Sequence, residues 1–227
     1  MHRGVRRTQN DTTGAKANDT VTIGLKLAPT NLDIRNTAGS AIDQVLIGNV
    51  YEGLVARDEH NQVVPAIAKT WDVSDDGTTY TFHLNDGMTF SNGDKLDADD
   101  VAWSINELVT KQYHDADSLV NFVSVKASDP NTVELKLSAP YANLLWVLTG
   151  RPGLVFDKDA KYDAKTQAIG SGPYTVEKFV TNSSITLKAN PNYWGANKAN
   201  PNYWGANKAK TDTVVVRYFT DDNAAVN

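Results

Sequence analysis

The stretch Asp76-Gly-Thr-Thr-Tyr-Thr-Phe-His-Leu84 contains the clearest fold signal of the chain. Tyr80, Phe82 and Leu84 alternate with polar residues, which is the period of a strand with one buried face. The Asp-Gly pair just before the strand is a strong signal for a tight turn. Together with Trp71-Asp-Val73 on the other side of the turn, the stretch predicts a β-hairpin whose aromatic face belongs to the core.

Strand patterns outnumber helical ones on both sides of this hairpin. Further strands are predicted at 21–27, 123–126, 132–137, 184–188 and 213–219. Helical spacing starts near Ser40 and near Asp97, and a short helix is predicted at 141–149. Because tight turns join several of the strands, the pattern favours an α+β fold with mixed or antiparallel sheets. Trp71, Trp103 and Trp146 are predicted to lie in the core.

The composition excludes several functional classes. With 41% hydrophobic residues among 227, the chain can bury a core, and its net charge of −5 argues against a nucleic-acid surface. It has no cysteine, and its four histidines, His2, His60, His83 and His114, form no H-x-x-x-H pair. We therefore expect no catalytic residue, no metal and no cofactor. The acids at 97–100 are interpreted as the start of a helix.

The same ten residues, Lys-Ala-Asn-Pro-Asn-Tyr-Trp-Gly-Ala-Asn, occur twice in succession from Lys188 onward. Two copies are too few and too short for a solenoid array. Two Tyr-Trp pairs in such a loop could stack on sugars or peptides. The preferred interpretation is an insertion in a surface loop, because extra loop residues cost little free energy.

Seven motifs follow one another in a fixed order. They are Tyr51-Glu-Gly-Leu54, Ala66-Ile-Ala-Lys-Thr-Trp-Asp72, Asp76 to Leu84, Asp86-Gly-Met-Thr-Phe-Ser-Asn-Gly-Asp94, Asp99-Asp-Val-Ala-Trp-Ser104, Gly170-Ser-Gly-Pro-Tyr174 and Asn190-Pro-Asn-Tyr-Trp-Gly195. Together they resemble the extracytoplasmic solute-binding proteins of family 5, the peptide, dipeptide and nickel group of ABC importers. The resemblance covers 21–227, and the ordered combination is far more specific than any one motif. Gly170 to Tyr174 by itself indicates a tight crossing rather than a phosphate loop.

The resemblance implies a fold of the periplasmic-binding-protein class, of which this chain would hold the N-terminal lobe without the second lobe. A disordered tail is expected at 1–20, lobe I at 21–50 and again at 169–227, and an additional subdomain at 51–168. The duplicated loop at 188–209 lies in the returning part. The final residues read as the opening of a helix that is cut at Asn227, so the chain is expected to be a fragment.

The function implied by the resemblance is that of a binding module. The whole protein would capture a peptide or similar small solute outside the cytoplasmic membrane and deliver it to the permease subunits. It would bind no nucleic acid, would not be an enzyme, and would touch the membrane only through a lipid anchor or the permease. A lobe with an adhesive or interaction role stays open, and so does a hydrolase, although no hydrolase motif is present.

The resemblance also implies ligand-binding residues. The loop at Ala38, Gly39 and Ser40 is expected to offer its backbone to a bound peptide. Arg151 stands where nickel-type relatives place an arginine that faces a ligand carboxylate, and its alternative is a surface residue after a helix end. Tyr113 lies in a segment that supplies a tyrosine to the cleft, with a solvated loop as the alternative. A single cleft wall predicts weak peptide binding, or none, by this chain alone.

Overall fold

The computed structural model of the chain describes residues 19–197 and 211–219. The strands are β1 (Thr20–Leu25), β2 (Val55–Arg57), β3 (Val63–Pro65), β4 (Ala68–Val73), β5 (Thr79–Leu84), β6 (Phe122–Asp129), β7 (Thr132–Leu137), β8 (Tyr174–Val180), β9 (Ser184–Ala189) and β10 (Thr213–Tyr218). The α-helices are α1 (Ser40–Leu46), α2 (Ala98–Lys111) and α3 (Leu144–Val147). Single 3-10 turns occur at η1 (Ala116–Ser118), η2 (Arg151–Gly153) and η3 (Trp194–Asn197).

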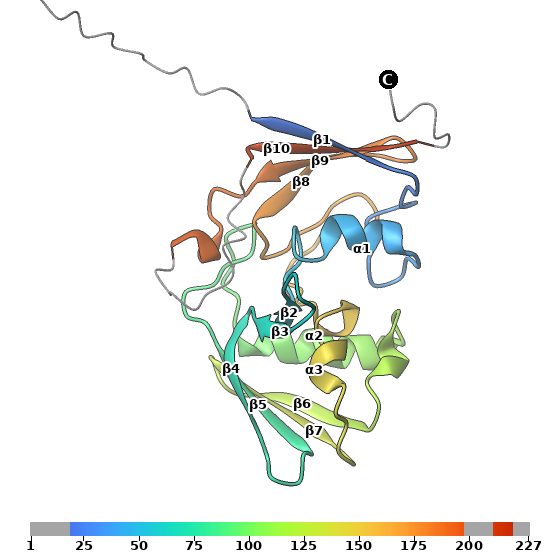
Figure 1. Cartoon of the computed structure of the whole chain (residues 1–227). Coiled ribbons are helices and arrows are strands. Elements are labelled where there is room, and N and C mark those ends of the chain that lie inside the picture. Colours follow the sequence, from blue (N-terminus) through green and yellow to red (C-terminus); the bar gives the residue numbers. More distant parts are fainter. Residues whose placement is uncertain (1–18, 198–210, 220–227) are drawn as a thin grey trace, which may run out of the picture.

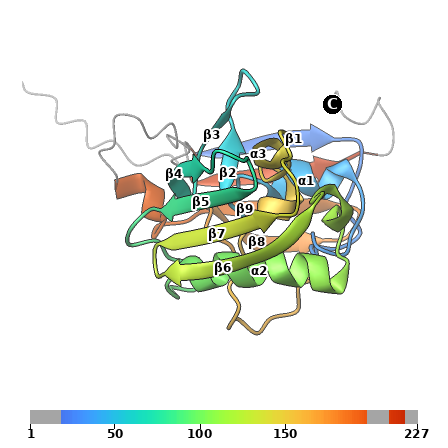
Figure 2. The ribbon, with the colours of Figure 1, turned by 90° about the horizontal axis from the view of Figure 1, so that it is seen from below.

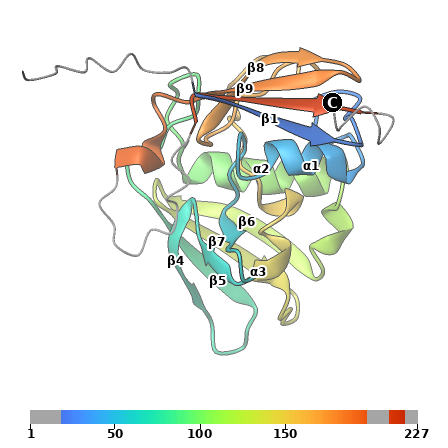
Figure 3. The same cartoon turned by 45° about the horizontal axis from the view of Figure 1, so that its top comes forward.

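The first sheet joins the two ends of the described chain. Its strand order is β1-β10-β9-β8, with β1 parallel to β10 and the other neighbours antiparallel. Ile185, Leu187 and Val216 from this sheet share a core with the apolar face of α1. Figures 1 and 3 show α1 directly beneath the sheet. Segments at opposite ends of the chain therefore build one layer.

The second sheet is antiparallel and has the order β4-β5-β7-β6. The predicted hairpin is confirmed as β4 and β5, and its Tyr80, Phe82 and Leu84 are all buried. Helix α2 packs against β6 and β7, and Figure 2 shows it running along that side of the sheet. The two helices α1 and α2 thus lie between the two sheets (Figure 1).

The predicted start of α2 is confirmed with its physical cause. The Asp97 carboxylate accepts a hydrogen bond from the Asp99 backbone N–H at 3.1 Å, and the Asp97 backbone N–H donates to the Asp100 carboxylate at 3.1 Å. This reciprocal capping box satisfies N–H groups that have no partner within the helix. The acids at 97–100 therefore serve the first turn of α2.

The motif Gly170-Ser-Gly-Pro-Tyr174 forms a close crossing, as predicted. Gly172 N–H donates to Val50 O and Tyr174 N–H donates to Asn49 O, both at 2.9 Å. An added Cβ on Gly170 would lie 2.0 Å from Val50 O. The two backbones thus approach so closely that a glycine is required for lack of space.

Other expectations need correction. Strand β1 is present, but Val21 and Ile23 are 40% and 44% exposed, so it is not the half-buried strand that its alternation predicts. Helix α3 is four residues long, because the predicted helix at 141–149 begins with turns. Trp146 is 43% exposed and stacks under the Arg57 guanidinium, 4.7 Å from its ring centroid, so its assignment to the core is wrong. Trp71 and Trp103 pack against the core only as partly buried residues.

Strands β2 and β3 escape sequence prediction because three residues are too few to show a period. The predicted tail lies almost wholly outside the described residues, as do the second copy of the repeat and the segment 221–227. The domain boundaries at 51 and 169 stay a prediction. No helix in the described ranges is long and apolar enough to cross a membrane.

Candidate functional site

Arg151 is the centre of a hydrogen-bond cluster, and it is buried, with 7% of its surface exposed. It begins η2, and its Nε–H donates to the Asp43 carboxylate of α1 at 2.8 Å. The guanidinium also donates to three backbone carbonyl oxygens, those of Ile34 at 2.8 Å, Thr37 at 2.7 Å and Gly39 at 3.2 Å. Four of its five N–H groups are therefore used within the chain. The alternative of a surface residue after a helix end is wrong.

The three predicted loop residues are held by this cluster. Ala38, Gly39 and Ser40 are exposed. Arg151 binds the carbonyl groups of Thr37 and Gly39, on either side of Ala38, and Ser40 begins α1. Gly39 has φ 112° and ψ 150°, a backbone conformation open only to glycine. The loop therefore presents its backbone to solvent in a fixed shape. The structure brings Arg151 and Gly39 into direct contact, although 112 positions separate them.

Tyr113 lies just after α2, whose C-cap residue, Gln112, has a left-handed conformation. The adjacent His114 N–H donates to Arg35 O at 2.9 Å, which ties the end of α2 to the loop before α1. A hollow of about 410 Å³ opens here. It is lined by Arg35, Asn36, Gln112, Tyr113, His114, Asp115, Ala116 and Asp117. This volume falls within the range of about 300–1,000 Å³ that small-molecule sites occupy.

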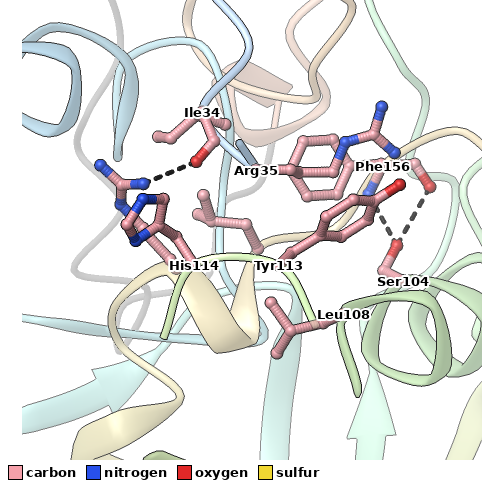
Figure 4. A pocket seen from close by; sticks show the side chains of 9 residues that line it. Ile34, Arg35, Ser104, Leu108, Tyr113, His114 and Phe156 are labelled. Carbon is pink, nitrogen blue, oxygen red and sulfur yellow. Dashed lines mark hydrogen bonds between the residues drawn. The ribbon is translucent and has the colours of Figure 1, made fainter. Parts of the chain in front are cut away.

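Arg35 is a site residue that sequence reasoning missed. Its guanidinium carbon lies 5.3 Å from the Tyr113 ring centroid and 5.0 Å from that of Phe156. Figure 4 shows Arg35 over the ring of Phe156 with Tyr113 beside it. No sequence signal points to this arrangement, because the three residues come from three distant segments.

A narrower gap shares Arg35, Tyr113 and His114 with the hollow, and Figure 4 shows His114 and Arg35 on opposite sides of it. Its volume of about 10 Å³ admits no more than about one water molecule. Ser104 lines the gap and is held in place by two hydrogen bonds. Its hydroxyl accepts from Phe156 N–H at 2.9 Å and donates to Asp100 O at 2.7 Å. Of these two spaces, only the hollow has room for more than a water molecule. Whether Ala38, Gly39, Ser40, Tyr113 and Arg151 touch a ligand stays a prediction.

A second polar cluster surrounds Glu52 of the motif Tyr51-Glu-Gly-Leu54. Its carboxylate is buried and accepts from the Tyr193 hydroxyl at 2.6 Å and from the Trp194 indole N–H at 2.8 Å. Tyr193 and Trp194 belong to the first copy of the repeat and are 3% and 5% exposed. The Tyr-Trp pair of this copy therefore packs in the core, while Pro191 and Asn192 are exposed, and the interpretation of the repeat as an insertion in a surface loop stays a prediction. The second copy lies outside the described residues.

The pKa of Glu52 is raised to about 7 by burial, against the lowering effect of the hydrogen bonds from Tyr193 and Trp194. Because the folded protein holds this proton more tightly than the unfolded chain, the contribution of Glu52 to stability is fully present below about pH 4.5. The contribution is lost as pH rises from about 4.5 through about 7.

We expect the Glu52→Gln variant to remove this pH dependence. Between about pH 5 and about pH 8, the unfolding free energy of the parent should fall by about 2–3 kcal/mol relative to that of the variant. Urea titrations of both proteins at the two pH values measure this difference. A constant difference would show that the carboxyl group titrates normally in the folded state.

Comparisons with known proteins give the chain its relatives. Residues 62–227 match the family of bacterial extracellular solute-binding proteins, family 5, middle region. Protein XP55 of Streptomyces lividans is 32% identical over 190 residues, which cover 80% of this chain and 34% of that protein. The dipeptide-binding protein of Escherichia coli K12 is 32% identical over 162 residues, covering 59% of this chain and 30% of that protein.

A solved structure agrees with the fold. That of NikZ from Campylobacter jejuni in complex with Ni(L-His) matches with a TM-score of 0.77 at 24% identity, over 92% of this chain and 41% of that chain. The predicted α+β fold of the periplasmic-binding-protein class is thereby confirmed. The chain spans about a third of the length of the curated relatives it matches.

Proposed function

Because the chain belongs to the bacterial extracellular solute-binding proteins of family 5, we propose that it forms part of one wall of a cleft that captures a small solute outside the cytoplasmic membrane. The observation that supports this most is the exposed loop at Ala38, Gly39 and Ser40, fixed in shape by Arg151 beside the hollow at Tyr113. A preformed backbone surface next to a hollow suits a binding module, since little order has to be gained on binding.

Short peptides are the proposed solute. Four relatives are named for peptides: a dipeptide-binding protein, a di/tripeptide-binding protein, a peptide transport protein and a glutathione-binding protein. Peptide backbone can pair with the exposed backbone groups of the loop without regard to side-chain identity. The whole protein would deliver the solute to the permease subunits of an ABC importer. We propose that a lipid anchor attaches the whole protein to the membrane.

The wall works without chemical change to the solute. Ala38, Gly39 and Ser40 offer backbone hydrogen bonds, and Tyr113 offers a ring and a hydroxyl at the edge of the hollow. Arg151 is a positioning residue in this proposal, because one N–H at most is left for a ligand after its four intramolecular bonds.

We expect this chain by itself to bind di- to pentapeptides weakly. One wall leaves half of a ligand in water. The dissociation constant should therefore lie in the millimolar range, which corresponds to a binding free energy of about −4 kcal/mol. Calorimetry and NMR titration with peptide mixtures measure it. Submicromolar binding would show that these residues make a complete site. Loss of the weak binding in a Gly39→Val variant, whose backbone cannot keep the loop conformation, would support the assignment of the loop.

A further inference from the structure

We propose that Arg35 is the residue of this wall that binds a carboxylate group of the solute. The inference rests on the proposed function and adds to it the chemical class of the group that is recognised. It replaces Arg151 in that role by an arginine that neither the sequence nor the comparisons single out.

The donors of Arg35 are available. Among the described residues, no hydrogen bond is donated by its guanidinium, and its nearest carboxylate, that of Asp33, lies 3.9 Å from Nε. That distance is too long for a hydrogen bond. The Asp33 carboxylate already accepts from Asn36 Nδ2 at 2.8 Å and from the Arg35 backbone N–H at 3.2 Å. Since no Arg35 nitrogen is among the buried unpaired polar atoms, these donors reach solvent.

The guanidinium is also fixed in place. Its side chain is 22% exposed, and the rings of Tyr113 and Phe156 lie within 5.3 Å of its carbon. Stacking of this kind leaves the N–H edge of the planar group free for two parallel hydrogen bonds to a carboxylate. Because the side chain is already ordered by the rings, binding costs little further side-chain entropy.

The charges around the hollow indicate where a solute's carboxylate and ammonium groups would bind. Among the described residues, Arg35 is the one arginine or lysine in its lining, and Asp115 and Asp117 supply negative charge. These two acids repel a carboxylate, so Arg35 is the place where a carboxylate gains energy. A zwitterionic solute, with an ammonium group near the acids, would satisfy both signs.

Contrast with Arg151 strengthens the assignment. Arg151 is 7% exposed and donates to Asp43 and three carbonyl groups, whereas the Arg35 guanidinium, at the edge of the hollow, donates no hydrogen bond to the described residues and has only the 3.9 Å ion pair with Asp33 among them. Arg151, whose donors are used within the chain, therefore holds the structure together. Arg35, which is ordered and has donors left, suits recognition of a ligand.

The test compares L-alanyl-L-alanine with its C-terminal amide by ¹⁵N NMR titration of the full 227-residue chain. The acid should bind about tenfold more tightly than the amide, as expected for one charge-assisted hydrogen-bond pair that stays partly in water. In an Arg35→Gln variant the two probes should bind alike. Arg35→Lys, which keeps the charge and loses the fork, should give an intermediate ratio.

Arg57→Gln is the matched control, because Arg57 also stacks on an aromatic ring, that of Trp146, but does not line the hollow. It should keep the full preference for the acid. Equal binding of acid and amide by the parent chain would overturn the role of Arg35 and leave the proposed function standing. A preference that survives in Arg35→Gln would do the same. If neither probe shifts any resonance at millimolar concentration, the proposed function itself fails, and the inference with it.

Discussion

A Gly170→Ala variant should be destabilised by about 4 kcal/mol or more, which is an exceptional cost for a single methyl group. The new Cβ would lie 2.0 Å from Val50 O, 2.7 Å from Val50 C and 2.9 Å from the Tyr51 ring. Real Cβ atoms do not approach backbone this closely, so the crossing segments would have to separate.

Separation would also break the hydrogen bonds that Gly172 and Tyr174 donate across the crossing, each 2.9 Å long. The crossing links the start of β8 to the chain between α1 and Glu52, so the first sheet should loosen as a whole. Urea unfolding followed by tryptophan fluorescence measures the loss. Protection of the β8 and β9 amides from hydrogen exchange reports whether it is confined to this sheet.

Gly150→Ala is the control for this variant. Gly150 has φ −102°, which any residue can adopt, and its nearest contact for a new Cβ is 3.5 Å from Val147 O. The cost there should stay within about 1 kcal/mol. Equal stability of the Gly170 and Gly150 variants would contradict this prediction. It would show that the crossing can accommodate a Cβ at Gly170.

The second large effect is expected for Arg151→Ala, at about 3 kcal/mol. Truncation leaves the Asp43 carboxylate and the carbonyl groups of Ile34 and Thr37 without their partner. Breaking a buried ion pair costs about 3–5 kcal/mol, and Asp43, whose side chain is 35% exposed, recovers part of this from water.

The variant should also release the loop that Arg151 holds. Amides at 36–40 should lose protection from hydrogen exchange, and amides of the second sheet should not. Arg151→Lys keeps the charge but reaches fewer carbonyl groups, so an intermediate loss is expected. A stable Arg151→Ala protein with an unchanged loop would show that the guanidinium is not what holds it.

Local patterns determined much of the fold. The Asp-Gly turn and the alternation of Tyr80, Phe82 and Leu84 predict β4 and β5 correctly, because turn chemistry and a period of two act between neighbouring residues. The acids at 97–100 predict the start of α2 for the same reason, since a cap needs only the first turn. Strand β2, with three residues, is too short to carry such a pattern, whereas α3 was predicted but is shorter than the expected helix at 141–149.

Burial was not predictable in the same way. Trp146 reads as a core residue and β1 as a half-buried strand, and the structure leaves Trp146, Val21 and Ile23 exposed. Tyr193 and Trp194 read as loop aromatics, and the structure places them with Glu52 in one buried cluster. A residue type fixes how much free energy burial would gain or cost, but only the packing of distant segments decides whether the burial takes place.

The amino-acid sequence by itself determined the turns, the caps, the long strands and the family, because each depends on residues that are close in the chain or on an ordered set of motifs. The tertiary structure alone decided that Arg151 donates to carbonyl groups of the loop at 34–39 and that Arg35 lies against the rings of Tyr113 and Phe156. Both arginines have the same charge and the same donors. Their contacts differ because the fold brings backbone carbonyl groups to the guanidinium N–H groups of Arg151 and aromatic rings to the face of the Arg35 guanidinium.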